Sequence, residues 1–224
     1  MKHSKRLTRL ILGLTLCSIS IYINVQANIG LSPWDTLNMG VSKTLSISLG
    51  SSSILISMII LALDILLREK IGIGTLLNIY IIGKLLDLWI YLDIIPMQDS
   101  LIIGMILNII SQFILAIGSY FYIGASYGCG PRDSFTVGIN KRFPKASIGA
   151  VKSIIEGIVL IIGYLMGAKI GIGTVMFVLG IGYFMNFVFN NRGLEVKDIK
   201  HEDLLYTFRN ISISLPFKTS NKSK

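Results

Sequence analysis

The sequence has little charge, and this shortage excludes several classes of protein. Only 15% of its 224 residues are Asp, Glu, Lys or Arg, whereas a soluble domain carries about 25%. Together with 52% hydrophobic residues and a mean hydropathy of +0.69, this excludes a soluble enzyme, a disordered protein and a conventional nucleic-acid binder. We therefore expect a chain that contacts the lipid bilayer and has no nucleic-acid partner.

Cysteine and histidine are also scarce. Cys17 and Cys129 lie in an apolar run and in a basic loop, so neither a disulfide framework nor a metal site is expected. The two histidines, His3 and His201, fall in polar end segments. No Ser-His-Asp or metal-ligand pattern lies within the apolar runs, and we expect no enzymatic activity, no cofactor and no metal.

Six apolar runs are long enough to cross a hydrocarbon core of about 30 Å, which needs about 17–25 helical residues. The first run follows four basic residues and also has the pattern of a secretory signal, but its counterpart deep in the chain favours a retained helix. The runs lie near residues 10–27, 51–67, 75–92, 101–125, 148–167 and 174–190.

Two motifs recur in the same order along the chain. Gly-Leu-Ser-Pro-Trp-Asp-Thr at 30–36 matches Gly-Cys-Gly-Pro-Arg-Asp-Ser at 128–134, and Ile-Gly-Ile-Gly-Thr at 71–75 returns unchanged at 170–174. Because each unit holds three spans, an odd number, the second unit must enter the membrane from the opposite side, which predicts inverted repeats. The predicted units are a first three-helix repeat (1–97), a second three-helix repeat (98–190) and a polar cytoplasmic tail (191–224).

Basic residues gather in the segments that one orientation places on the cytoplasmic side. With the N-terminus inside, the inner segments 1–9, 68–74, 126–147 and 191–224 hold seventeen of the 21 Lys and Arg residues. Lys and Arg are enriched in cytoplasmic loops. The predicted fold is therefore an all-α membrane protein with six transmembrane helices in two inverted three-helix repeats, and with both termini inside.

The Gly-x-x-Pro-x-Asp motifs follow the first span of each repeat. Pro33 and Pro131 must end a helix, because proline lacks an N–H donor and disfavours helix in the residue before it. Asp35 and Asp133 are suited to capping a new short helix. Each motif is either a stop-and-cap device or a broken backbone that lines a path for a solute or an ion. The short helices are expected over 34–46 and 132–142.

Ionisable side chains inside spans are costly and are candidate functional residues. Lys84 and Asp87 lie three apart in the third span, and Lys152 and Glu156 lie four apart in the fifth. Both spacings place two side chains on one face of a helix, where they can pair. Each pair either fixes helix packing or responds to a proton or an anion.

Two further features are predicted to be structural. Asp64 and Arg68 are expected to form an anchoring ion pair at the inner end of the second span. The Gly-Ile-Gly-Thr segments are expected to make tight turns, with Thr75 and Thr174 as the N-caps of the following helices.

The motifs as a group resemble a known family. Gly-Leu-Ser-Pro-Trp-Asp, Gly-Cys-Gly-Pro-Arg-Asp-Ser and the two Ile-Gly-Ile-Gly-Thr segments are similar to those of the YczE/YyaS/YitT-type bacterial integral membrane proteins, in particular the YczE-like branch. The likeness runs from residue 10 to about residue 190, with Cys129 and Ser134 as departures. It implies a multi-pass protein of the bacterial cytoplasmic (plasma) membrane without an assigned biochemical activity.

Two functions are compatible with these features. The first is a secondary transporter or exporter of a small-molecule solute, in which the Pro-x-Asp segments are gates, Arg132 attracts anions and the paired charges couple protonation to movement. The second is a regulatory or scaffold protein that binds a cytoplasmic protein partner through the basic loop 126–147 and the tail. The candidate transport or gating residues are Pro33, Asp35, Pro131, Arg132, Asp133, Lys84, Asp87, Lys152 and Glu156.

Overall fold

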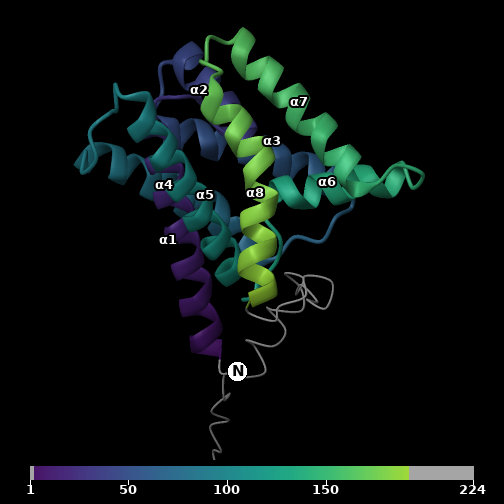
Figure 1. Cartoon of the computed structure of the whole chain (residues 1–224). Coiled ribbons are helices and arrows are strands. Elements are labelled where there is room, and N and C mark those ends of the chain that lie inside the picture. Colours follow the sequence, from purple (N-terminus) through teal and green to yellow (C-terminus); the bar gives the residue numbers. More distant parts are fainter. Residues whose placement is uncertain (1–2, 192–224) are drawn as a thin grey trace, which may run out of the picture.

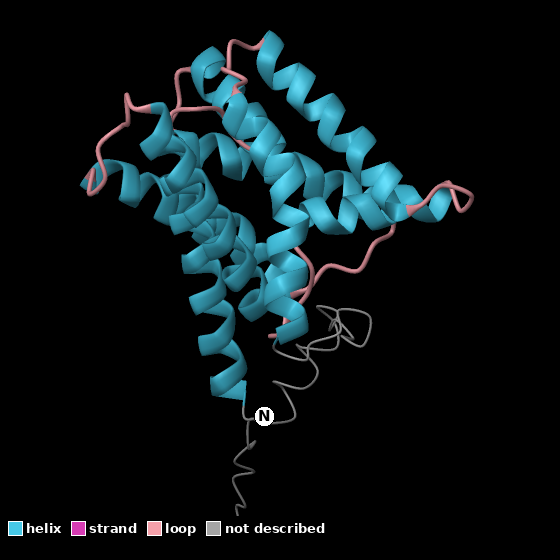
Figure 2. Cartoon of the chain, viewed as in Figure 1, coloured by secondary structure: helices cyan, strands magenta, loops and turns pink. Residues whose placement is uncertain are grey.

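The computed structural model describes residues 3–191, and the regular structure in that range is entirely helical (Figures 1 and 2). Six helices are long and apolar enough to cross a membrane, and two are short. The long helices are α1 (His3–Ala27), α3 (Leu49–Leu66), α4 (Ile73–Leu92), α5 (Leu101–Ile123), α7 (Ile148–Leu165) and α8 (Ile172–Asn191). The short helices are α2 (Pro33–Leu45) and α6 (Pro131–Arg142). Beyond Asn191, the predicted tail lies outside the described residues.

The six predicted spans and both predicted short helices are confirmed, but α4 and α8 begin earlier than expected. They start at Ile73 and Ile172, so Thr75 and Thr174 are third residues of their helices. The prediction that these threonines are N-caps is therefore wrong. Each hydroxyl instead reaches back one turn, and Thr75 Oγ1 accepts a hydrogen bond from the Gly72 N–H at 3.2 Å, which satisfies a donor that the helix start leaves unpaired.

Helices α1 and α5 form the most extensive helix–helix contact in the described part of the chain. Small residues let the two backbones approach closely, as is usual between membrane helices. A methyl group added at Gly118 of α5 would lie 2.9 Å from the Cys17 sulfur of α1, and one at Gly13 would lie 2.8 Å from the Gly118 carbonyl oxygen. Helix α4 packs against α1, and α8 packs against α5, so the two lie on either side of this pair.

Each short helix packs against a long helix from the other half of the chain. Helix α2 lies against α7, and α6 lies beside α3 (Figure 1). Gly40 of α2 faces the Gly163 carbonyl of α7, and Gly138 of α6 faces the side chains of Leu67 and Glu69 just after α3. The two halves are therefore interlocked, because neither short helix can leave without breaking contacts with the opposite half.

Large apolar side chains cover the outward faces of the spans. On α7, Ile154, Ile158, Ile161 and Leu165 are each more than half exposed. Such surface would drive aggregation in water, whereas acyl chains solvate it in a bilayer as well as protein side chains would. The protein is thus a membrane protein whose outward helix faces contact lipid.

Candidate functional site

The two Gly-x-x-Pro loops each dock on the Ile-Gly-Ile-Gly-Thr turn of the other half. At one end of the molecule, the Gly173 N–H donates a 2.8 Å hydrogen bond to the Ile29 carbonyl oxygen. At the other end, the Gly74 N–H donates a 2.8 Å hydrogen bond to the Tyr127 carbonyl oxygen. The same backbone contact therefore occurs twice, once for each copy of the two motifs.

Glycine is required at these junctions because backbones touch there. Gly30 and Gly128 have φ angles of +112° and +123°, a region that residues with a Cβ rarely adopt. A Cβ at Gly72 would overlap the Tyr127 carbonyl, and a Cβ at Gly171 would overlap that of Ile29. The predicted tight turns are present, and they also form the docking surfaces for the two proline loops.

The docked loops fix where α2 and α6 begin. Both helices start at the motif proline, as the missing N–H predicts. In α2 the capping residue is Ser32, whose hydroxyl oxygen accepts a hydrogen bond from the Asp35 N–H at 3.2 Å. The prediction that Asp35 caps the helix is therefore wrong. Its carboxylate accepts hydrogen bonds from the Ser32 hydroxyl at 2.6 Å and from Asn38 Nδ2 at 3.3 Å.

The first turns of α2 and α6 meet through charged side chains. Arg132 Nη1 lies 3.8 Å from Asp35 Oδ1, with side-chain exposures of 25% and 7% respectively. The Arg132 guanidinium carbon lies 5.2 Å from the centre of the Trp34 ring, within the range of a cation–π interaction. We call Trp34, Asp35, Asn38 and Arg132 the Asp35–Arg132 centre. It joins two motifs that lie 98 positions apart in the sequence.

The Asp35–Arg132 centre retains unused hydrogen-bond donors. A guanidinium has five N–H groups, and within residues 3–191 Arg132 forms the 3.8 Å ion pair and no side-chain hydrogen bond. Burial lowers the pKa of Arg132 from its ordinary value, while the carboxylates of Asp35 and Asp133 act in the opposite direction. The positive N-terminal ends of α2 and α6 are nearby. This arrangement can bind an anionic group while Asp35 balances much of the positive charge.

Lys84 and Asp87 do not pair with each other. Lys84 is exposed, and it is absent from the ion pairs of the described residues. Asp87 instead accepts hydrogen bonds from the Gly50 N–H at 2.7 Å and the Ser48 hydroxyl at 2.6 Å. It therefore caps the start of α3 from the neighbouring helix α4.

Lys152 and Glu156 also lie apart from the centre, whereas Asp133 follows Arg132 in the first turn of α6. Lys152 and Glu156 form the predicted i, i+4 ion pair on α7 at 3.8 Å, with the lysine side chain 50% exposed. Asp133 is exposed, in contrast to its sequence counterpart Asp35. Of the nine candidates, five thus lie in the first turns of α2 and α6: Pro33, Asp35, Pro131, Arg132 and the exposed Asp133.

The predicted Asp64–Arg68 ion pair is wrong. Helix α3 ends at Leu66, and Arg68 adopts a left-handed φ of 59°, so the helical spacing that would align the two side chains is lost. Asp64 is completely buried, and neither of its carboxyl oxygens has a hydrogen-bond partner.

Comparison with known proteins establishes the family. Residues 4–190 match a family described as "Family of unknown function (DUF6198)". The chain belongs to this family. It is 34% identical over 186 residues to an uncharacterized protein of Haemophilus influenzae, which covers 83% of this chain and 84% of the relative.

Two further relatives come from Bacillus subtilis. The uncharacterized protein YyaS is 29% identical over 167 residues, 74% of this chain and 83% of YyaS. The uncharacterized membrane protein YczE is 26% identical over 177 residues, 78% of this chain and 81% of YczE. These matches confirm the resemblance to the YczE/YyaS-type proteins. No solved structure matches the chain.

A buried polar cluster between α1 and α5 was not predicted from the sequence. Asn24, Asn108 and Gln112 are at most 1% exposed. Gln112 Nε2 donates to Asn108 Oδ1 at 2.8 Å, and Ser20 donates to the Ser111 carbonyl at 2.7 Å. The cluster could have been predicted from the spacing of Asn108, Ser111 and Gln112. This spacing places three polar side chains on one face of an otherwise apolar span.

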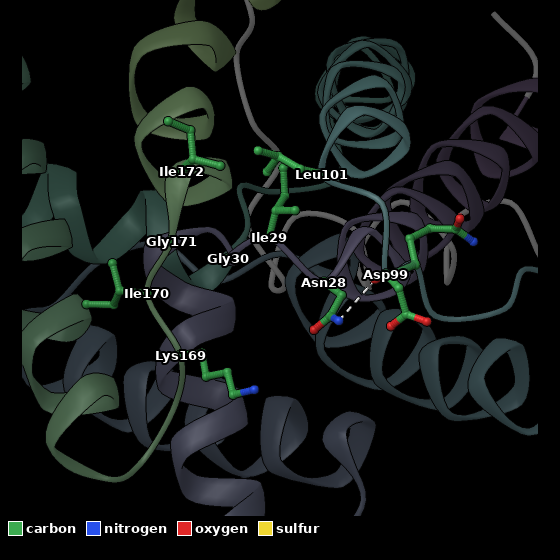
Figure 3. Close-up of a pocket in the computed structure, with 10 residues that line it drawn as sticks. Asn28, Ile29, Gly30, Asp99, Leu101, Lys169, Ile170, Gly171 and Ile172 are labelled. Atoms are coloured by element: carbon green, nitrogen blue, oxygen red, sulfur yellow. Dashed lines mark hydrogen bonds between the residues drawn. The ribbon is translucent and has the colours of Figure 1, made fainter.

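A hollow of about 410 Å³ opens where the ends of α1, α5 and α8 meet. Figure 3 shows Lys169 and Asp99 beside it, and the junction of Gly30 with Gly171 forms part of its wall. Asn28 Nδ2 donates a 3.1 Å hydrogen bond to the Gln98 carbonyl along its rim. The hollow and the Asp35–Arg132 centre share one loop, since Gly30 lies five residues before Asp35.

Proposed function

We propose that the protein is a secondary transporter of a small solute that carries an anionic group, and that the Asp35–Arg132 centre binds this group. The observation that carries the proposal is the meeting of two short-helix N-termini, one from each half, at an arginine with unused donors. Transporters commonly bind anionic groups at the N-termini of broken helices between two repeats. The hollow beside Gly30 would give the solute access from one end.

Within this proposal the two halves are inverted repeats, and the N-terminus lies in the cytoplasm of a bacterium. The described loops gather at two ends of the molecule, in support of this arrangement. At one end, the Gln98 N–H donates to the Gln26 carbonyl at 2.9 Å. At the other, Arg6 Nε donates to the Ala125 carbonyl at 3.1 Å. Among residues 3–191, the second end carries most of the basic residues, as cytoplasmic ends do.

The contacts of the basic loop favour transport over the scaffold alternative. Lys141 pairs with Glu69 at 2.6 Å. Arg142 donates to the Leu67 carbonyl at 3.2 Å, and Arg132 faces Asp35. Three of the four basic residues in 126–147 thus already contact acidic or carbonyl groups of the protein, which leaves fewer of them to attract a cytoplasmic partner.

A ligand screen with a matched control tests the proposal. The full chain in detergent is heated with a panel of small carboxylates, amino acids and inorganic phosphate, and thermal unfolding is followed for wild type, Arg132→Gln and Lys84→Gln. We expect at least one anionic compound to raise the unfolding temperature of wild type and of Lys84→Gln but not of Arg132→Gln. Counterflow of that compound in proteoliposomes then measures transport.

The proposal fails on either of two results. One is a panel in which no compound stabilises the wild-type chain. The other is a stabilising compound whose effect and counterflow are the same in Arg132→Gln as in wild type, because its site would then lie elsewhere.

A further inference from the structure

Asp64 is a buried acid without a partner. It lies in the last turn of α3, is 0% exposed, and has no hydrogen bond to either carboxyl oxygen within the described residues. A charged carboxylate cannot be kept in such a place without a compensating positive charge or hydrogen-bond donors. A protonated carboxyl is neutral, and it gains a donor that can bond to a carbonyl of its own helix.

The surroundings of Asp64 add to the cost of a negative charge. The Glu69 N–H donates a 2.9 Å hydrogen bond to the Asp64 backbone carbonyl, which brings a second carboxylate near Asp64, and the C-terminal end of α3 carries a partial negative charge. No described cation lies within ion-pair distance of Asp64. The helices packed against α3 carry further titratable groups. These are Asp35 and Lys43 of α2, Tyr80, Lys84, Asp87 and Tyr91 of α4, and Arg132, Asp133, Lys141 and Arg142 of α6, with Cys129 just before α6.

A proton explains this site better than a metal cation does. Among the described residues, no group of three metal-ligating side chains occurs. The nearby acid, Glu69, is already bound to Lys141, so it is not available to share a cation with Asp64.

Helix α6 packs against the end of α3 that carries Asp64, and it is tied at both of its ends. Near its C-terminus, Lys141 binds Glu69 at 2.6 Å, and Arg142 donates to the Leu67 carbonyl at 3.2 Å. At its N-terminus, Arg132 faces Asp35 at 3.8 Å. A shift of α6 relative to α3 would therefore change the surroundings of Asp64 and the Asp35–Arg132 centre together.

We propose that Asp64 is a proton-binding site that holds its proton while α6 is packed against α3, and that release of the proton separates the two helices. Ionisation places a negative charge in a site without compensation, and movement of α6 admits water to solvate it. In the transport cycle this makes the proton the coupling ion, a role that rests on the function proposed above. The binding site and the movement are tested without any solute.

Infrared spectroscopy of the full chain, with labelled aspartate, tests protonation directly. We expect the carbonyl-stretching band of a protonated carboxylic acid in wild type and in Glu156→Gln, and its loss in Asp64→Asn. The band should disappear in alkaline buffer. If Asp64→Asn does not fold, Asp64→Glu in the chain with labelled aspartate replaces it, because the new glutamate carries no label and the labelled band should be lost. A wild-type spectrum without such a band in neutral buffer overturns the proposal.

Spin-label distances test the coupled movement. Labels at Leu66→Cys and Phe143→Cys, both at exposed positions, report the separation of α3 and α6 in a chain with Cys17→Ala and Cys129→Ala. We expect the distance to increase from acidic to alkaline buffer in this chain and in its Glu156→Gln variant, and to stay constant with Asp64→Asn. An unchanged distance in the parent chain, or a full response in Asp64→Asn, overturns the proposal even if transport is found.

Discussion

At the scale of single residues, the repeated glycines are contact points between backbones. Gly72 has an ordinary φ of −104°, so alanine could adopt its conformation. The obstacle is the Tyr127 carbonyl, which occupies the place of a Cβ. A substitution at Gly72 therefore measures the cost of steric crowding alone. At Gly30 or Gly128 a substitution would also strain the backbone.

We expect Gly72→Ala to lower the free energy of unfolding by about 1–3 kcal/mol, the usual cost of overpacking. Gly157→Ala on α7 is the matched control, because nothing lies within 4 Å of an added Cβ there and alanine favours helix by about 1 kcal/mol over glycine. Thermal unfolding in detergent measures both. Equal unfolding temperatures for the two variants would contradict the docking role of the turn.

The Cys129 thiol should react slowly with maleimides. It lies in the loop before α6, where burial raises its pKa to about 12, with the charges of Asp133 and Glu69 adding to the effect. The thiolate is the reactive form, so a shift of about three pKa units lowers its fraction about a thousandfold near neutral pH. Because the pKa is raised, the labelling rate should still increase above pH 9. A cysteine at the exposed position Lys145 provides the reference rate, and an equal rate at Cys129 would refute the expectation.

At the scale of helices, capping between neighbours fixes how the spans sit against each other. Asp87 of α4 binds the first turn of α3 through the Ser48 hydroxyl and the Gly50 N–H. Close to these bonds, Gly50 and Gly83 allow the two helices to touch. The charge of Asp87 therefore stabilises the α3–α4 contact.

Asp87→Leu should destabilise the protein by about 1.5–3 kcal/mol, the range for hydrogen bonds to a charged group. Lys84→Gln, one turn away on the same helix and exposed, should change stability by less than about 0.5 kcal/mol. Unfolding in detergent distinguishes the two. If Lys84 and Asp87 acted instead as a coupled pair, the two substitutions would have similar effects on stability or on transport.

The elements could be predicted from the sequence, but their partners could not. Hydropathy and proline position define where each helix begins and ends, because both act locally. The pairing of Asp35 with Arg132 depends on which helices pack together, which no local pattern encodes. Sequence spacing alone also did not predict which charged side chains pair. Lys152 and Glu156 pair across one turn of α7, whereas α3 ends before Arg68 can align with Asp64.

At the scale of the whole molecule, the proposed orientation makes a direct prediction about sidedness. Single cysteines replace Thr44 and Lys145, both exposed, in a chain with Cys17→Ala and Cys129→Ala. An impermeant thiol reagent should label Thr44→Cys in intact cells and Lys145→Cys only after permeabilisation. Labelling of both positions from outside, or of neither, would contradict inverted repeats with the N-terminus inside.

The exchange of loops between the halves has a consequence for synthesis of the protein. As the chain enters the membrane from its N-terminus, α2 and the loop before it have no docking partner until α7 and the turn at 170–174 have been made. The first three spans therefore lie in the bilayer without their final helix contacts until the second half has been made. We therefore expect a fragment that ends after residue 97 to keep an unpaired proline loop and to be less stable in the membrane than the full chain. The C-terminal spans thus complete the folding of the N-terminal ones.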